Sequence, residues 1–275
     1  MTDQTPAVIM VAPNGARKTP ADHPALPVTP DAVARTAAEC AEAGASALHL
    51  HVRDAAMEHS LDPELYRAAI AAVRREAGAG FIIQITTEAV GRCAPDQQMS
   101  CVRDVRPEAA SLAVRELCPD AESEAGFGAF CEWMGRERVA PQFILYDAAD
   151  VERFRDLRRR GVIALDRPFV LYVLGRYAAG QQSDPVDVLP FIHAAGDDAL
   201  DWAVCAFGRR EAACAAAVAL DGHARVGFEN NMLLVDGRTA PDNAALVAQA
   251  VRAAELIGRP VASPAAARQL LGVGP

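Results

Sequence analysis

Short runs of hydrophobic, often β-branched residues alternate with longer alanine-rich stretches along the chain. The short runs predict buried strands and the longer stretches predict helices, which is the order expected for parallel strands joined by crossover helices. The predicted strands are Ala7–Pro13, Ala47–Val52, Phe81–Thr86, Ala109–Ala113, Gln142–Tyr146, Phe169–Leu174, Trp202–Phe207 and Ala224–Phe228. Eight such units within 275 residues indicate a (β/α)₈ TIM barrel, formed as a single domain over residues 1–275.

Two helix starts and one helix end are marked by their residue types. Thr29 precedes Pro30 and Asp62 precedes Pro63, so each pair predicts an N-cap followed by proline at the first helical position. Gly44 stands where a glycine commonly ends a helix, just before the second predicted strand.

Two further segments differ from this regular alternation. Residues Asn14–Pro30 are long for a strand-to-helix connection and contain four prolines, which predicts a functional loop or a lid. Residues Arg115–Arg136 read as irregular, and we expect them to cover the mouth of the barrel or to make a subunit contact.

The second predicted strand carries two histidines in the run ALHLHVRD. The two-residue repeat of a strand turns His49 and His51 to one side and Leu48, Leu50 and Val52 to the other. Two neutral imidazoles suit Zn²⁺, Fe²⁺, Ni²⁺ or Co²⁺ better than Ca²⁺ or Mg²⁺. The pair alone is equally consistent with two hydrogen-bonded histidines in a polar interior.

The last predicted strand places polar residues at the end of the barrel where TIM-barrel active sites lie. It is followed by Glu229 and Asn230, and strands one, two and eight are neighbours in a closed barrel, so Glu229 can reach His49 and His51. Two histidines and a carboxylate make a metal site with open positions. Taken alone, Glu229 is also consistent with a solvated loop acid or a helix cap. Asp54, which closely follows His51, is consistent with an acceptor for an imidazole N–H or with the cap of a turn.

Composition narrows the function classes. The chain has 27 Lys and Arg against 36 Asp and Glu, a formal charge of −9, and no basic stretch, so we expect no nucleic-acid partner. The early apolar run Ala7–Ala12 is far shorter than the ~20 residues of a membrane span. We therefore expect a cytoplasmic small-molecule enzyme without a membrane partner. Its seven cysteines contain no C-x-x-C motif and read as reduced core residues.

Seven segments together resemble the β-keto acid cleavage enzyme family, whose founding type is 3-keto-5-aminohexanoate cleavage enzyme. They are VAPNGARKTPADHPALPVTP (11–30), HLHVRD (49–54), IIQITT (82–87), VAPQFILYD (139–147), WAVCAFGR (202–209), GHARVGFENN (222–231) and IGRPVASPAAAR (257–268). The resemblance runs from end to end of the chain. It implies a TIM barrel, usually a homotetramer.

The resemblance also implies a reaction. A β-keto acid and acetyl-CoA, as co-substrate, become acetoacetate and a new acyl-CoA in a Claisen-type exchange. A divalent metal, normally Zn²⁺, is expected on residues matching His49, His51 and Glu229, where it would act as a Lewis acid. The partners expected are therefore a small β-keto acid and a CoA ester.

Further site residues follow from the same resemblance. Arg225 matches an arginine that forms a dyad with the catalytic acid. Thr86 takes the place of a serine that helps to hold the substrate carboxylate, and we place Thr87 and Asn14 with it among the substrate-binding residues.

The chain departs from the family at the general base. Asn230 stands where the family usually has an aspartate, and an amide cannot accept that proton at neutral pH. Glu88 and Glu116 are candidate replacements, although each is also consistent with a surface acid. Two alternatives therefore stay open: a metal-dependent C–C lyase or hydrolase that does not use CoA, and a catalytically inactive binding paralogue.

A second departure concerns the substrate. Arg17 stands where the founding type has a glutamate for the substrate's amino group, and Ile144 where it has a second acid, so a 5-amino substrate is not expected. A guanidinium suits a dicarboxylic or otherwise anionic β-keto acid. Alternatively, Arg17 pairs with Glu116 or Glu88 across the pocket, a charge swap from which no substrate preference follows. Two Gly-Arg pairs, 175–176 and 208–209, are consistent with CoA phosphate contacts or with plain turns.

Overall fold

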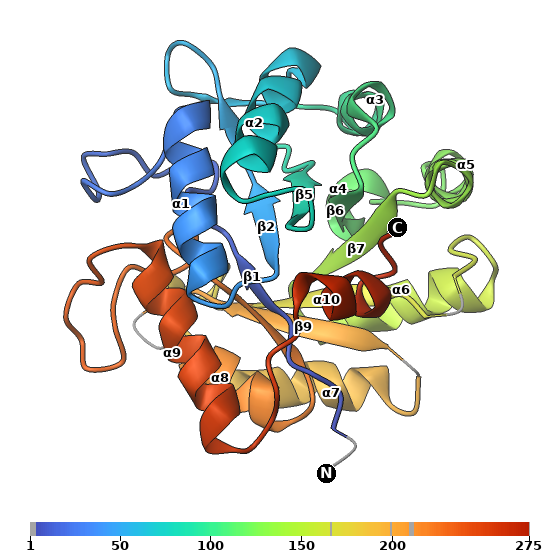
Figure 1. Ribbon diagram of the computed structural model, residues 1–275. Coiled ribbons are helices and arrows are strands. Elements are labelled where there is room, and N and C mark those ends of the chain that lie inside the picture. The colour runs from blue at the N-terminus through green and yellow to red at the C-terminus, as the bar shows by residue number, and fades with distance from the viewer. Residues whose placement is uncertain (1–3, 166, 199, 209–211, 275) are drawn as a thin grey trace.

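Parallel strands close into a barrel in the computed structural model of this chain, as predicted (Figure 1). The structure describes residues 4–165, 167–198, 200–208 and 212–274. Within them the barrel strands are β1 (Ile9–Val11), β2 (Ala47–Leu50), β5 (Ile82–Thr86), β6 (Ala109–Ala113), β7 (Ala140–Leu145), β8 (Phe169–Leu174), β9 (Asp201–Ala206) and β10 (His223–Val226). Neighbours follow the order β1–β10–β9–β8–β7–β6–β5–β2 around the ring. Each strand matches a predicted one to within two residues at either end.

Helices surround this barrel and bury their apolar sides against it (Figure 1). Both predicted helix starts are confirmed, because the Thr29 and Asp62 side chains accept backbone hydrogen bonds at the first turns of α1 and α2. The α-helices described are α1 (Pro30–Glu42), α2 (Pro63–Glu76), α3 (Pro95–Val105), α4 (Val114–Leu117), α5 (Glu124–Glu137), α6 (Ala148–Arg159), α7 (Leu189–Ala195), α8 (Ala212–Ala219), α9 (Asn243–Leu256) and α10 (Pro264–Leu270). Two 3₁₀ turns, η1 (Ala179–Gln181) and η2 (Pro185–Val188), follow β8.

The prediction of an irregular segment over Arg115–Arg136 is wrong, because α4 and α5 occupy most of it. Phe127, Phe130 and Met134 recur at helical spacing on α5 and are fully buried. This burial outweighs the low helix propensity of the glycines in the segment. At one of them, Gly128, α5 lies close to the backbone of Val162, because a Cβ at this position would lie 3.2 Å from the Val162 backbone oxygen.

A small antiparallel hairpin, which the sequence pattern did not predict, follows β2. Its strands are β3 (Val52–Arg53) and β4 (His59–Ser60). The Asp54 carboxylate accepts backbone hydrogen bonds from Ala56 and Glu58, so this residue caps the hairpin turn rather than supporting an imidazole. The hairpin extends the histidine strand beyond the barrel and lies beside the loop between β1 and α1, which Arg53 contacts.

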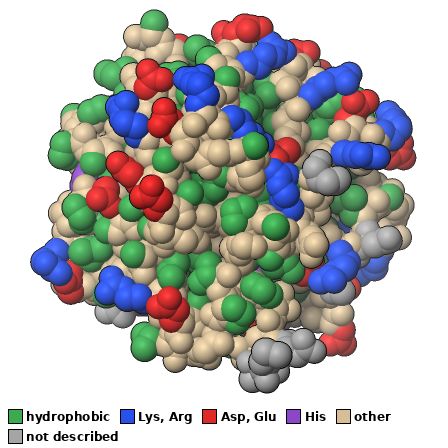
Figure 2. Space-filling view, in the orientation of Figure 1, with side chains coloured by type: hydrophobic (Ala, Val, Ile, Leu, Met, Phe, Trp, Pro, Cys, Tyr) green, Lys and Arg blue, Asp and Glu red, His purple; other side chains and the backbone are tan. Residues whose placement is uncertain are grey.

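The two ends of the barrel differ. At the amino end, α10 lies across the opening, and Leu271 packs with Met10, Ile82 and other buried side chains inside the barrel (Figure 1). On this face, charges of both signs are interspersed with hydrophobic side chains (Figure 2). Further along the barrel the interior becomes polar, with buried His49 and Gln84. The carboxyl end is therefore where a site can form. No helix in the described ranges is long and apolar enough to cross a membrane.

Candidate active site

Three side chains converge at the carboxyl end of the barrel. His49 is on β2, His51 follows that strand, and Glu229 follows β10. The two Nε2 atoms lie 3.1 Å apart, and Glu229 Oε2 lies 3.6 Å from His49 Nε2 and 3.3 Å from His51 Nε2. Because β10, β1 and β2 are adjacent in the ring, the structure brings these residues together as the sequence predicted.

The surroundings of His49 favour a metal-binding form of its ring. His49 Nδ1 donates a hydrogen bond to Gln84 Oε1 at 2.8 Å, and Gln84 in turn donates to Gln142 at 3.2 Å. A proton on Nδ1 leaves Nε2 with a free lone pair. Burial, together with the positive charge of Arg225, lowers the pKa of His49 to about 3, so the imidazole is neutral at neutral pH.

Glu229 is held in its charged form. Burial alone would raise the pKa of Glu229, but the neighbouring Arg225 guanidinium opposes this and holds that pKa well below its usual range. Arg225 Nη2 donates to Glu229 Oε1 at 3.0 Å, whereas the buried Oε2 has no hydrogen-bond partner. The oxygen without a partner is the one that faces the two histidines.

These distances fit a metal ion. Two atoms that each lie ~2.1 Å from one ion are roughly 3–3.5 Å apart when they occupy neighbouring coordination positions. The three observed separations lie close to that range, and the ligand atoms of the group all lie within 4.8 Å of one another. The group can therefore hold a divalent metal, with two nitrogens and one oxygen as ligands.

The turn after β10 turns Glu229 into the pocket, whereas Asn230 is not among the described residues that line it. Gly227 has φ +134°, and a Cβ there would lie 2.4 Å from the backbone oxygen of Ala12, so only glycine fits. The pocket lining in the described part of the chain includes Glu229 but not Asn230, whose side-chain amide is buried with both atoms unpaired. Arg225 consequently pairs with Glu229 and with Cys205 Sγ, rather than with position 230.

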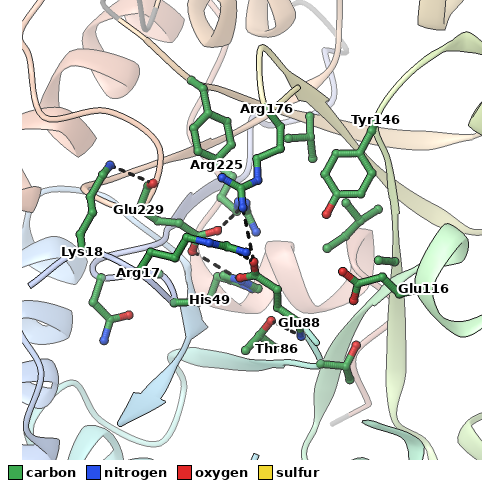
Figure 3. Close-up of a pocket in the computed structure, with 18 of the residues that line it drawn as sticks. Arg17, Lys18, His49, Thr86, Glu88, Glu116, Tyr146, Arg176, Arg225 and Glu229 are labelled. Atoms are coloured by element: carbon green, nitrogen blue, oxygen red, sulfur yellow. Dashed lines mark hydrogen bonds and ion pairs between the residues drawn. The ribbon is translucent and has the colours of Figure 1, made fainter. Parts of the chain in front are cut away.

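A pocket opens next to the candidate metal site, and residues that follow most of the barrel strands line it (Figure 3). Predicted site residues form much of this lining, and the others lie in the loop after β1, at the ends of the barrel strands or in the turns that follow them. The lining residues are Asn14, Gly15, Ala16, Arg17, Lys18, His49, Thr86, Thr87, Glu88, Ala113, Glu116, Ile144, Tyr146, Val173, Arg176, Gln181, Phe207, Arg225 and Glu229.

The three predicted substrate-binding residues with neutral side chains also shape the pocket wall. Thr86 Oγ1 accepts from the backbone N–H of Glu88 at 3.0 Å, and Thr87 Oγ1 donates to the backbone oxygen of Ser111 at 2.8 Å. Asn14 Nδ2 donates to the backbone oxygens of Pro27 and His51, at 3.0 and 3.2 Å. Asn14 therefore ties the loop after β1 to the segment that carries His51.

Charged residues gather at the outer part of the pocket (Figure 3). Arg17 Nη1 lies 2.7 Å from Glu88 Oε1, so the predicted alternative of a pair across the pocket is the one that forms. Arg176 Nη2 lies 3.7 Å from the same oxygen, and its guanidinium lies over the Phe207 ring. Its counterpart in the second Gly-Arg pair, Arg209, is outside the described residues.

Two basic residues near the pocket were missed by the sequence analysis. Lys18 donates to the backbone oxygens of Phe228 and Glu229, at 2.6 and 3.0 Å, and burial lowers its pKa. Arg53, which is buried, donates to three backbone oxygens of the loop after β1, those of Gly15, Ala16 and Lys18. Arg53 lies in the segment HLHVRD and Lys18 in the segment NGARK, but no periodicity in the sequence shows which backbone groups these side chains reach.

Glu116 lines the pocket wall opposite Glu229 (Figure 3). Its Oε2 accepts from the backbone N–H of Ala89 at 3.1 Å and from Gln98 Nε2 at 2.9 Å. Burial raises the pKa of Glu116, and the negative charge of Glu88 adds to this effect, although the two hydrogen bonds oppose it.

The chain is similar to known proteins over almost its whole length. A family model described as beta-keto acid cleavage enzyme matches residues 6–273. The chain is 31% identical to 3-oxoadipate:acetyl-CoA acetyltransferase from Cupriavidus necator, over 98% of this chain and 95% of that protein. It is also 31% identical to 3-keto-5-aminohexanoate cleavage enzyme from Fusobacterium nucleatum, over 97% of each. Among solved structures, apo ObcA matches with a TM-score of 0.73 at 16% identity, a likeness of fold that covers 92% of this chain and 66% of ObcA.

Proposed function

The chain belongs to the β-keto acid cleavage enzyme family, and from this premise we propose that it exchanges acyl groups between a β-keto acid and acetyl-CoA. The products would be acetoacetate and a new acyl-CoA. The observation that carries the proposal is the convergence of His49, His51 and Glu229 beside a pocket rich in cations. This exchange needs a carbanion equivalent on the keto acid, and the site offers positive charge where that species would develop.

Zn²⁺ is the metal that we propose for the three ligands. Bound there, it would supply Lewis acidity toward the carboxylate and keto oxygens of the substrate. The protein's own contribution is to present each ligand ready for the ion. Gln84 fixes the ring of His49 in the tautomer that frees Nε2, and Arg225 keeps Glu229 ionised with Oε2 facing the histidines.

The remaining lining residues have distinct proposed roles. Thr86 Oγ1 already accepts a hydrogen bond from a backbone N–H, so its hydroxyl proton is available to the substrate carboxylate. Arg225 is a positioning residue for Glu229 and adds buried positive charge beside it. Thr87 and Asn14 act through the backbone that they hold, since their donors are bonded to Ser111, Pro27 and His51.

The charges of the pocket favour an anionic substrate. The described lining of the pocket contains four Lys and Arg side chains against three Glu side chains, so it keeps a small surplus of positive charge. Lys18 is bonded to backbone oxygens rather than to a carboxylate. A substrate ammonium group would be repelled here, whereas a second carboxylate would be attracted. We therefore propose a dicarboxylic β-keto acid, a class that includes the 3-oxoadipate in the name of the Cupriavidus relative.

The test is a mass-spectrometric assay of the purified, zinc-loaded protein with dicarboxylic, neutral and cationic β-keto acids, each with and without acetyl-CoA. We expect acyl-CoA and acetoacetate only when acetyl-CoA is present, and fastest with the dicarboxylic acids. Cleavage that does not require acetyl-CoA would replace the proposal with a lyase or hydrolase. No turnover of any acid would replace it with a binding protein. The family resemblance also leads us to propose a homotetramer, which light scattering would test.

A further inference from the structure

Three carboxylates line the pocket, and their environments differ. Glu229 pairs with Arg225 and faces the histidines, and Glu88 is held between Arg17 and Arg176. Glu116 has no Lys, Arg or His nitrogen of a described residue within 4.0 Å. It is thus the acid whose charge is not already balanced by a neighbouring cation.

The Glu116 carboxylate is anchored by one oxygen only. Oε2 accepts two hydrogen bonds, from the Ala89 backbone and from Gln98, which fix the plane of the group. Within the described residues Oε1 has no such bond, and it is not buried away from the cavity. The carboxylate points into the pocket from the side opposite Glu229 (Figure 3). An acid held in this way can accept a proton without losing its position.

The place of Glu116 in the fold brings it within reach of a substrate at the metal site. It follows β6 directly, and only β5 separates β6 from β2, the strand of His49. Two strand spacings amount to roughly 10 Å, and the side chains converge from both sides of that gap. A short keto acid lying between them would contact both.

The charge environment also suits a base. Burial and the nearby Glu88 raise the pKa of Glu116, which brings it closer to neutral pH than an ordinary glutamate. Of the other charged groups that face it, Arg17 acts in the opposite direction. By contrast, Asn230 carries no ionisable group and lies off the pocket lining that the structure describes.

We propose that Glu116 moves the substrate's C2 proton, in place of an acid at position 230. This assignment rests on the proposed acyl exchange. Glu116 Oε1 takes a proton from the methylene between the carboxylate and the keto group, and the C–H electron pair passes into the enolate. C2 then forms a bond to the acetyl carbon of acetyl-CoA, and the CoA thiolate leaves.

The second half of the reaction returns the proton. The thiolate attacks the original keto carbon, the bond from that carbon to C2 breaks, and acyl-CoA forms. The electron pair stays on the acetoacetate enolate, whose C2 regains the proton from Glu116. No net proton is taken up or released, and no oxidant or reductant is needed. A single carboxylate with one free oxygen is sufficient for both transfers.

The test separates proton transfer from acyl exchange. Exchange of the C2 protons of a β-keto acid with D₂O is followed by NMR without acetyl-CoA, and acyl-CoA formation is measured separately. Glu116→Gln keeps the size and the hydrogen-bond acceptor but cannot accept a proton. We expect it to lose ~10²–10⁴-fold in both rates, with KM and zinc content little changed. Glu132→Gln, on the exposed face of α5, serves as the matched control and should keep both rates.

Each outcome has a defined meaning. Loss of both rates in Glu116→Gln, with a smaller loss in Glu88→Gln, supports the assignment. If Glu116→Gln exchanges the C2 protons with D₂O as fast as the wild type does, and the wild type carries out acyl exchange, the assignment is overturned but the proposed function is not. A larger loss in Glu88→Gln than in Glu116→Gln overturns it in favour of Glu88. Absence of acyl exchange in the wild type would instead overturn the proposed function, and with it this assignment.

Discussion

Replacing Gly15 with alanine tests whether the loop after β1 sets the position of Glu229. Gly15 has φ +62°, and a Cβ built there would lie 2.6 Å from Glu229 Cγ. Carbon atoms in ordinary contact are ~3.5–4.0 Å apart, so Glu229 or the loop would have to move by roughly 1 Å. The variant therefore displaces a proposed metal ligand without removing any of its atoms.

The expected magnitude follows from two separate costs. An alanine in the left-handed region costs on the order of 1–2 kcal/mol of unfolding free energy. A displacement of ~1 Å at a reacting group can cost ~100-fold, and we expect a similar ~100-fold loss of zinc affinity, which corresponds to about 2.7 kcal/mol. The first cost belongs to the backbone of Gly15 and the second to the side chain of Glu229.

The assay measures both quantities. Zinc affinity is obtained by titration of the apo protein against a competing chelator, and unfolding free energy by urea titration. Gly272→Ala is the matched control, because Gly272 has φ +65° but a Cβ there would meet nothing within 4 Å. Both variants should lose stability, and only Gly15→Ala should lose zinc affinity. Equal zinc affinity in Gly15→Ala and the wild type would refute the reasoning.

Three further predictions concern other parts of the structure. Zinc binding should weaken in each of three variants, His49→Ala, His51→Ala and Glu229→Ala, by more than the ~10–100-fold expected when a residue that only hydrogen-bonds to a ligand is replaced. Full metal retention after dialysis in all three would rule out the site. Arg53→Met leaves three backbone oxygens of the loop after β1 without a donor, so it should lower the unfolding free energy by about 3 kcal/mol. Trypsin should also cleave that loop faster than in the wild type, and an unchanged cleavage rate would contradict the prediction. Burial lowers the pKa of His223 to about 3, so below pH ~6.5 the unfolded chain binds one more proton than the folded protein, and the unfolding free energy falls as the pH drops toward 3. His223→Gln should flatten this pH dependence by up to ~1.4 kcal/mol per pH unit, as measured by urea titrations at several pH values. An unchanged slope would show that other groups cause it.

The strands and the orientation of His49 and His51 could be predicted because both depend on local periodicity. A two-residue repeat identifies a buried strand, and the same repeat turns His49 and His51 to one side. The position of Glu229 required only the neighbour rule for the first, second and last strands of a closed barrel. Each of these inferences uses either a short-range sequence pattern or the fixed strand order of a closed barrel. The structure has this strand order and brings the two histidines and Glu229 together.

The features that the sequence did not settle depend on contacts between segments far apart in the chain. The helix α5 was overlooked because two glycines concealed a helical repeat that burial of Phe127 and Phe130 stabilises. The pairing of Arg17 with Glu88 joins two loops, 71 residues apart, and stayed one of two alternatives. The turn at Gly227, two residues before Glu229, depends on its close approach to the backbone of Ala12.

Arg53 and Lys18 hold the pocket through backbone oxygens rather than through side chains. None of these oxygens belongs to Arg17, so these contacts do not constrain which side chain occupies position 17. Mutation there can change the charge at the pocket entrance while His49, His51 and Glu229 keep their places. Under the proposed function, the barrel separates the part of the site that recognises a substrate from the part that activates it, and selection for a new keto acid can act on the first without dismantling the second.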